Sequence, residues 1–235
     1  MTLRSQERAF ELSNEDLSAL AKVGRNLKVA KGEEIFTHGD EPDTLWLVKS
    51  GRVHLTKTSS AGAESLVAFY GAGQSFCAAA TIINKPLPCS ARAATDCELI
   101  AVPAAAFKRL FDGLPSFAKR LLTEMAPQFC DAHCDCALNV ESVETRLAST
   151  LLRLDRQFAG GTIPFTRQEI AQMVNTTVES CIRTLSSWNK KGWIEGGRGE
   201  VLVKDRDALE EMAQVKEGGT PSRRATCDER KPSTE

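Results

Sequence analysis

Eight cysteines are the residues of this chain best suited to metal or redox chemistry: Cys77, Cys89, Cys97, Cys130, Cys134, Cys136, Cys181 and Cys227. Thiolates are soft ligands that favour iron–sulfur clusters, zinc and copper(I) over hard cations. Cys130 and Cys134 are spaced so that they share one face of a helix. Cysteine also packs in protein cores as a small hydrophobic residue. A chemical role and a packing role therefore both stay open.

A second group of residues has the spacing of a DNA-reading head. The run TRQE at 166–169 is a capping box that begins a helix, and TTVE at 176–179 predicts a second box opening a helix to about Lys190. Asn175 tolerates the left-handed conformation of a tight turn between them. The glycine-rich segment 192–204 predicts a hairpin. The pattern is that of a winged helix-turn-helix.

In such a unit, residues near the start of the second helix meet base edges in the major groove. Glu179 can accept a hydrogen bond from cytosine, and Arg183, one turn later, can donate two to guanine. Phosphate contacts are predicted for Thr166, Arg167, Thr177, Lys190, Lys191 and Arg198. The plainer alternatives are that Glu179 only closes its capping box and that Arg183 is a solvated helix residue.

Composition limits the function classes. The 235 residues include 30 basic and 31 acidic side chains, a formal net charge of −1 and 42% hydrophobic residues. This balance excludes a general attraction to nucleic acid or membrane, so a basic footprint must be local. No apolar run approaches the roughly 20 residues of a membrane helix, and the N-terminus lacks the pattern of a signal peptide. We expect a cytoplasmic protein without a membrane partner, in a compartment that disfavours structural disulfides.

Four segments follow along the chain. Short strands separated by glycines predict an antiparallel β domain over 1–113, and a long helix is expected over 114–158. The head occupies 159–215, and the polar segment 216–235 is predicted to be a disordered tail. One apolar stripe on the helix favours pairing with a second copy, with Pro127 expected to kink it or mark its restart; the stripe contains Leu121, Met125, Phe129, Ala132, Cys136, Val140, Val143, Leu147 and Leu154.

Two segments together resemble the CRP/FNR family of bacterial transcription regulators. TRQEIAQMVNTTVESCIRTLSSWNKKGWIE resembles the DNA-binding end of that family, and KGEEIFTHGDEPDTLWLVKSGRVHL resembles its cyclic-nucleotide-binding-like β-roll. The resemblance implies an α+β fold with an N-terminal β-roll, a long dimerisation helix and a C-terminal winged helix-turn-helix. It also implies a homodimer that binds a palindromic double-stranded DNA site, with RNA polymerase as a further partner.

By motif position, Glu179 and Arg183 match the family's residues that read a TGA-like half-site core. Val178 lies where the residue helps to separate CRP-type from FNR-type sites, and valine favours the latter. Ile182 departs from the FNR pattern, in which serine is usual, so the complete half-site is not predicted.

The resemblance also places the family's ligand pocket, and there this chain differs. Ala78 replaces the glutamate and Cys89 the phosphate-pairing arginine of the family's cyclic AMP receptors, while Arg92 falls on the opposite face of its strand. Cyclic AMP sensing is therefore not expected. Cys77 and Cys89 lie at this pocket, and the family's long helix forms its other wall. We predict a site of four thiolates, with Cys136 and His133 in reserve: Cys77, Cys89, Cys130 and Cys134.

An iron–sulfur cluster, a soft metal ion and a thiol redox switch all suit these cysteines, and a packing role stays open. Cys97 resembles a core cysteine of the family and is excluded from the site. A haem sensor using one of the three histidines, His38, His54 and His133, and a ligand-independent regulator are the alternatives. The sequence contains no convincing catalytic triad, phosphate-binding loop or dinucleotide fingerprint, so we do not expect an enzyme, and a thiol-dependent one is the least favoured reading.

Overall fold

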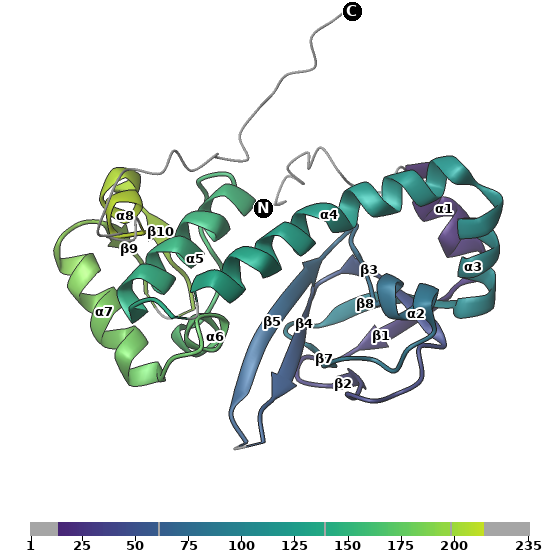
Figure 1. The fold of residues 1–235 in the computed structure, drawn as a ribbon, viewed down its shortest axis with the longest axis horizontal. Coiled ribbons are helices and arrows are strands. Elements are labelled where there is room, and N and C mark those ends of the chain that lie inside the picture. The colour runs from purple at the N-terminus through teal and green to yellow at the C-terminus, as the bar shows by residue number, and fades with distance from the viewer. Residues whose placement is uncertain (1–13, 61, 139, 198, 214–235) are drawn as a thin grey trace, which may run out of the picture.

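The computed structural model describes residues 14–60, 62–138, 140–197 and 199–213. After α1 (Asn14–Val23), the N-terminal half forms two four-stranded antiparallel sheets (Figure 1). The first sheet has the order β1 (Arg25–Val29), β8 (Cys97–Pro103), β3 (Thr44–Ser50) and β6 (Ser75–Phe76). The second has the order β2 (Glu34–Phe36), β7 (Ser90–Ala93), β4 (Arg52–Thr58) and β5 (Glu64–Gly71). The predicted antiparallel β domain is confirmed.

Strand β4 illustrates how residue alternation positions side chains in this domain. Val53 and Leu55 point into the core between the sheets, where Val48, Tyr70 and Leu99 are also buried. Since successive side chains alternate between faces, Arg52 and His54 point to the outer face of the second sheet. His54 is nevertheless only 8% exposed, so another element must cover this outer face.

Helices connect the β domain to the C-terminal unit. Helix α2 (Ala78–Ile83) precedes β7, and α3 (Ala104–Gly113) follows β8. The predicted single helix over 114–158 is in fact two, α4 (Pro115–Leu138) and α5 (Val143–Gln157). Ser142 caps α5 by accepting a hydrogen bond from the Thr145 amide. Helix α4 continues through Pro127, so the interruption lies further along the chain than the proline suggests.

The apolar stripe predicted to form one dimer seam is divided among three environments. Leu121 is fully buried against the β domain, whereas Leu147 and Leu154 are fully buried in the core of the C-terminal unit. Phe129 is 68% exposed and Val140 is 89% exposed. The chain itself therefore covers both ends of the stripe, whereas these two residues from its middle are exposed.

The C-terminal unit, which we call the reading head, contains the predicted winged helix-turn-helix. It consists of α6 (Arg167–Met173), α7 (Val178–Lys190), the paired strands β9 (Ile194–Glu195) and β10 (Leu202–Val203), and α8 (Arg206–Ala213). Helix α5 packs against α8 and α7 and so belongs to its core. Among the described residues, no helix combines the length and apolarity needed to cross a membrane. The predicted tail, 216–235, lies outside them.

Candidate functional site

The first helix of the reading head begins with the predicted capping box. The backbone amide of Thr166 donates to Oε2 of Glu169 at 2.6 Å, and the Glu169 amide donates to Oγ1 of Thr166 at 3.2 Å. Two amides that a helix start leaves without partners are thus satisfied reciprocally. The prediction for α6 is confirmed.

The start of α7 differs from the prediction by one residue. Its N-cap is Thr177, whose Oγ1 accepts from the amide of Ser180 at 3.2 Å, so the second capping box predicted at 176–179 is wrong. The shift occurs because Asn175 takes a left-handed φ of 51°, which leaves Thr176 in the turn. Glu179 therefore lies inside the first turn and is not used to cap the helix.

Helix α7 buries one face and exposes the other. Its buried face consists of Cys181, Thr184, Leu185 and Trp188. Val178 and Ile182 are 41% and 46% exposed. Glu179 and Arg183 are exposed beside them, and neither has a hydrogen bond or ion pair with another described residue. Two apolar and two charged side chains are thus presented together on the first turns of α7.

The predicted phosphate-contacting residues have different surroundings. Thr166, Thr177 and Lys190 are exposed, whereas Lys191 places its Nζ 4.5 Å from the ring centre of Trp193. Arg167 is half-buried near Cys181, with its Nη1 buried and without a hydrogen-bond partner among the described residues. Burial lowers the pKa of Arg167 and raises the pKa of Cys181 to about 11. Arg198 lies outside the described residues.

The interior of the β-roll is filled by aromatic rings. Phe76 is 1% exposed, and its ring centre lies 5.4 Å from that of Tyr70, 6.2 Å from Phe36 and 6.3 Å from Trp46. Cys89 is buried in the same core, Ala78 is buried in the neighbouring core with Leu45 and Phe107, and Arg92 is exposed on the outer face, as predicted. The residues at these positions therefore offer neither the carboxylate nor the guanidinium that a cyclic nucleotide requires.

Cys77 and Cys89 both pack against the core of the β-roll. Burial raises the pKa of both thiols, and the neighbouring Cys89 raises that of Cys77 further. Cys77 also has a φ of 68°, a left-handed conformation that costs energy for any residue other than glycine. The two thiols are thus close together, protonated and partly or fully shielded from solvent in this conformation.

The other predicted ligands lie on α4, whose backbone is described, but the side chains of Cys130, His133, Cys134 and Cys136 lie outside the description. Within the described part of the chain, no three histidine, cysteine or acidic side chains converge on a metal site. Cys97 is buried and its Sγ donates to the carbonyls of Arg52 and Thr95. Of the histidines proposed for haem, His38 is exposed and His54 is buried.

Comparison with known proteins divides the chain into the same two units, the β-roll and the reading head. The chain matches the cyclic nucleotide-binding domain over residues 26–113 and the Crp-like helix-turn-helix domain over residues 145–212. The second match begins inside α5, in agreement with the packing of that helix in the reading head.

Similar full-length proteins are transcription regulators. The cyclic AMP receptor protein of Thermus thermophilus is 32% identical over 184 residues, which span 78% of this chain and 85% of that protein. The fumarate and nitrate reduction regulatory protein of Escherichia coli K12 is 25% identical, over 87% of this chain and 85% of that protein. The structure of FixK2 from Bradyrhizobium japonicum has the same fold, with a TM-score of 0.73 and 22% identity over 82% of this chain and 98% of that one. The chain belongs to the CRP/FNR family of transcription regulators.

Proposed function

We propose that two copies of this chain read a palindromic DNA site through the exposed face of α7. The observation that carries the proposal is the position of Glu179, which Thr177 frees from capping and which lies one turn before Arg183 on the same exposed face. Both side chains are therefore available for hydrogen bonds to bases in a major groove. The exposure of Phe129 and Val140 supports pairing with a second copy through this part of the chain.

The half-site is expected to contain a TGA-like core, as the family motif at Glu179 and Arg183 implies. Selection from a pool of random double-stranded oligonucleotides tests this directly. The wild-type protein should enrich inverted repeats in which the centres of the two half-sites lie one helical turn apart. If the selected sequences share no motif or contain no inverted repeat, under both reducing and oxidising conditions, the proposal is wrong. Contact with RNA polymerase remains a prediction.

We further propose that the sensor responds to a redox or metal signal through cysteines and not to cyclic AMP. Three features support this: Ala78 and Cys89 replace the nucleotide-binding side chains, aromatic rings fill the β-roll, and Cys77 is held in a strained conformation beside Cys89. Strain at a non-glycine residue is often retained for function. Cys130 and Cys134 of α4 would complete a set of four thiolates able to hold an iron–sulfur cluster or a soft metal ion.

The buried thiols set a chemical requirement on this mechanism. Because burial favours the protonated forms of Cys77 and Cys89, metal binding must release their protons, and oxidation must follow a local opening that admits the oxidant. Purification with and without oxygen, followed by absorption spectra and metal analysis, tests the proposal. A colourless, metal-free protein whose DNA affinity is the same with and without oxidant would exclude the cysteine-based signal.

A further inference from the structure

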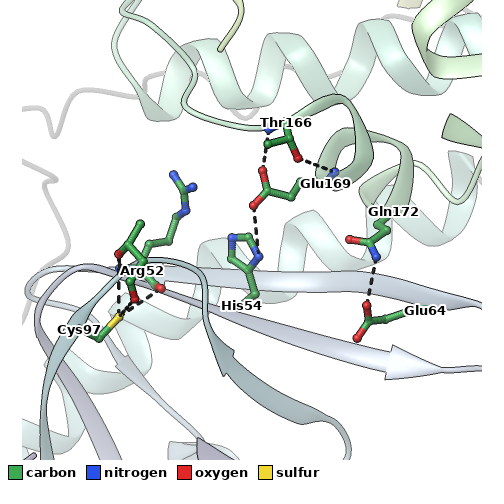
Figure 2. A network of polar contacts seen from close by, with 8 residues as sticks. Arg52, His54, Glu64, Cys97, Thr166, Glu169 and Gln172 are labelled. Atoms are coloured by element: carbon green, nitrogen blue, oxygen red, sulfur yellow. Dashed lines mark hydrogen bonds and ion pairs between the residues drawn. The ribbon is translucent and has the colours of Figure 1, made fainter. Parts of the chain in front are cut away.

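The outer face of the second sheet is covered by the reading head. Arg52 and His54 on β4 and Glu64 on β5 point towards α6 and the segment before it (Figure 2). Leu66 of β5 is buried in the core of the reading head, and α6 packs along β5.

Polar contacts also join the two units. Nε2 of Gln172 donates to Oε2 of Glu64 at 3.1 Å, and Nδ1 of His54 lies 3.7 Å from Oε1 of Glu169. The second contact involves the same Glu169 whose other oxygen closes the capping box of α6 (Figure 2). The β-roll is thus joined to the residue that defines the start of the first helix in the reading head.

Phe165 contributes to the apolar part of this contact, together with Leu66 and the stacked rings of Phe69 and Phe158. The Phe165 ring has the Arg52 guanidinium 4.5 Å from its centre, the His54 ring stacked at 5.9 Å and the Phe69 ring edge-on at 4.8 Å. Cation–π and aromatic contacts of this kind fix orientation as well as distance. The residue that precedes the capping box is therefore held on three sides by the β-roll.

We propose that these residues form a latch by which the β-roll positions the reading head for DNA binding, a role that rests on the DNA-reading function proposed above. The latch consists of Arg52, His54 and Glu64 in the β-roll and Phe165, Glu169 and Gln172 in the head. It engages α6, while the side chains of Glu179 and Arg183 on α7 stay exposed to solvent. Fixing α6 in this way reduces the orientational freedom that each head loses on binding DNA.

The latch is built to be reversible. Nε of Arg52 and Nε2 of His54 are buried without hydrogen-bond partners in the described part of the chain. Each such buried polar atom carries a desolvation cost that opposes the favourable contacts around it. The latch should therefore open without unfolding either unit, because each has its own buried core.

Exchanging the two side chains of the cross-unit hydrogen bond tests this proposal. Gln172→Glu places a second carboxylate against Glu64, so α6 should separate from β5. Hydrogen–deuterium exchange of the full-length protein should then become faster in β5 and α6 but not in the centre of α7. Affinity for the inverted repeat selected by the wild type should fall about tenfold, as expected for a like-charge contact replacing a favourable one.

The double variant Glu64→Gln with Gln172→Glu restores a carboxylate–amide pair in the opposite direction. It should return both the hydrogen–deuterium exchange and the DNA affinity to near wild-type values. If Gln172→Glu acted by unfolding the protein or by adding a negative charge to the head, the second substitution would not restore them. Glu64→Gln alone should have a small effect, since two amides still form a hydrogen bond. Glu34→Gln, at an exposed position of β2 in the same sheet, is the matched control and should change neither measurement.

Unchanged exchange in Gln172→Glu would show that the latch does not exist in solution. Faster exchange with unchanged DNA affinity, or with no recovery in the double variant, would show that it does not position the head. If the wild type selects no inverted repeat, the DNA-reading proposal fails, and the exchange comparison still decides whether the latch exists.

Discussion

Nδ1 of His54 in the β-roll lies 3.7 Å from Oε1 of Glu169, the residue that closes the capping box at the start of α6. Burial lowers the pKa of His54 from 6.5 to about 4, and Glu169 opposes this effect without reversing it. His54 is therefore neutral near pH 7 and stays in its buried place by stacking on Phe165.

The first prediction concerns pH. Between about pH 4 and 6.5 the unfolded chain binds a proton at His54 that the folded chain does not. The free energy of unfolding should thus be highest above pH 6.5 and decrease as the pH falls towards 4, with a slope of up to about 1.4 kcal/mol per pH unit from this group.

Urea unfolding between pH 5 and 7.5 measures this slope. His54→Phe, which retains a ring against Phe165 but does not titrate, should flatten it. His38→Phe removes an exposed histidine and should leave it unchanged. Equal slopes in the wild type and His54→Phe would mean that His54 is not buried in its neutral form.

The second prediction separates base reading from phosphate binding. Arg183→Ala should weaken binding to the selected repeat by about 1–3 kcal/mol and relax the preference at one base pair of each half-site. Lys190→Ala, also on α7, should weaken binding to all sequences similarly and reduce the salt dependence by about one phosphate contact. Fluorescence anisotropy with single-base variants distinguishes them, and a uniform effect of Arg183→Ala on every sequence would contradict its assigned role.

The third prediction concerns the exposed apolar pair on α7. Val178 and Ile182 are spaced by one helical turn and point to the same side as Glu179 and Arg183. Apolar side chains there can contact thymine methyl groups. Replacing thymine by uracil in the half-site should therefore weaken binding of the wild type more than binding of Ile182→Ser. An identical effect of uracil on both proteins would place Ile182 away from any thymine methyl.

The fourth prediction uses the strain at Cys77. Because its φ is 68°, Cys77→Gly relieves backbone strain of about 1 kcal/mol, which should offset the loss of the buried thiol. Cys77→Ala removes the same thiol and keeps the strain, so it should unfold at a lower temperature than Cys77→Gly.

Both variants should bind DNA independently of oxidant or metal. Cys97→Ser should keep the response, because the Cys97 thiol is buried in the core and donates to backbone carbonyls. Thermal unfolding and DNA titrations with and without peroxide make the comparison. If the DNA affinity of Cys77→Gly still responds fully to peroxide, Cys77 is not part of the sensor.

Local sequence signals predicted the elements correctly where a nearby residue determines them. The capping box of α6 depends only on Thr166 and Glu169, and the left-handed turn depends on Asn175. The same reasoning placed the α7 cap one residue early, because Thr176 and Thr177 are chemically equivalent and only the turn geometry distinguishes them. That single shift decides whether Glu179 caps the helix or is free to meet DNA.

Contacts between distant segments were not predictable in this way. The apolar stripe from Leu121 to Leu154 has one helical period, yet the chain divides it at the end of α4 and packs its ends into two cores. The latch was missed because His54 and Glu169 are separated by about half of the chain. One signal was present: a histidine between two core-facing residues of β4, at a position that alternation assigns to solvent.

The spacing of half-sites tests the central claim most directly, namely that two paired reading heads bind one palindrome. The affinity of the wild-type protein should be measured for the selected inverted repeat and for the same repeat with five base pairs inserted at its centre, about half a helical turn. Paired heads should lose most of their sequence-specific affinity for the lengthened site, because one half-site then faces the opposite side of the duplex. Equal affinity for the two sites would contradict paired reading and with it the function proposed for α7.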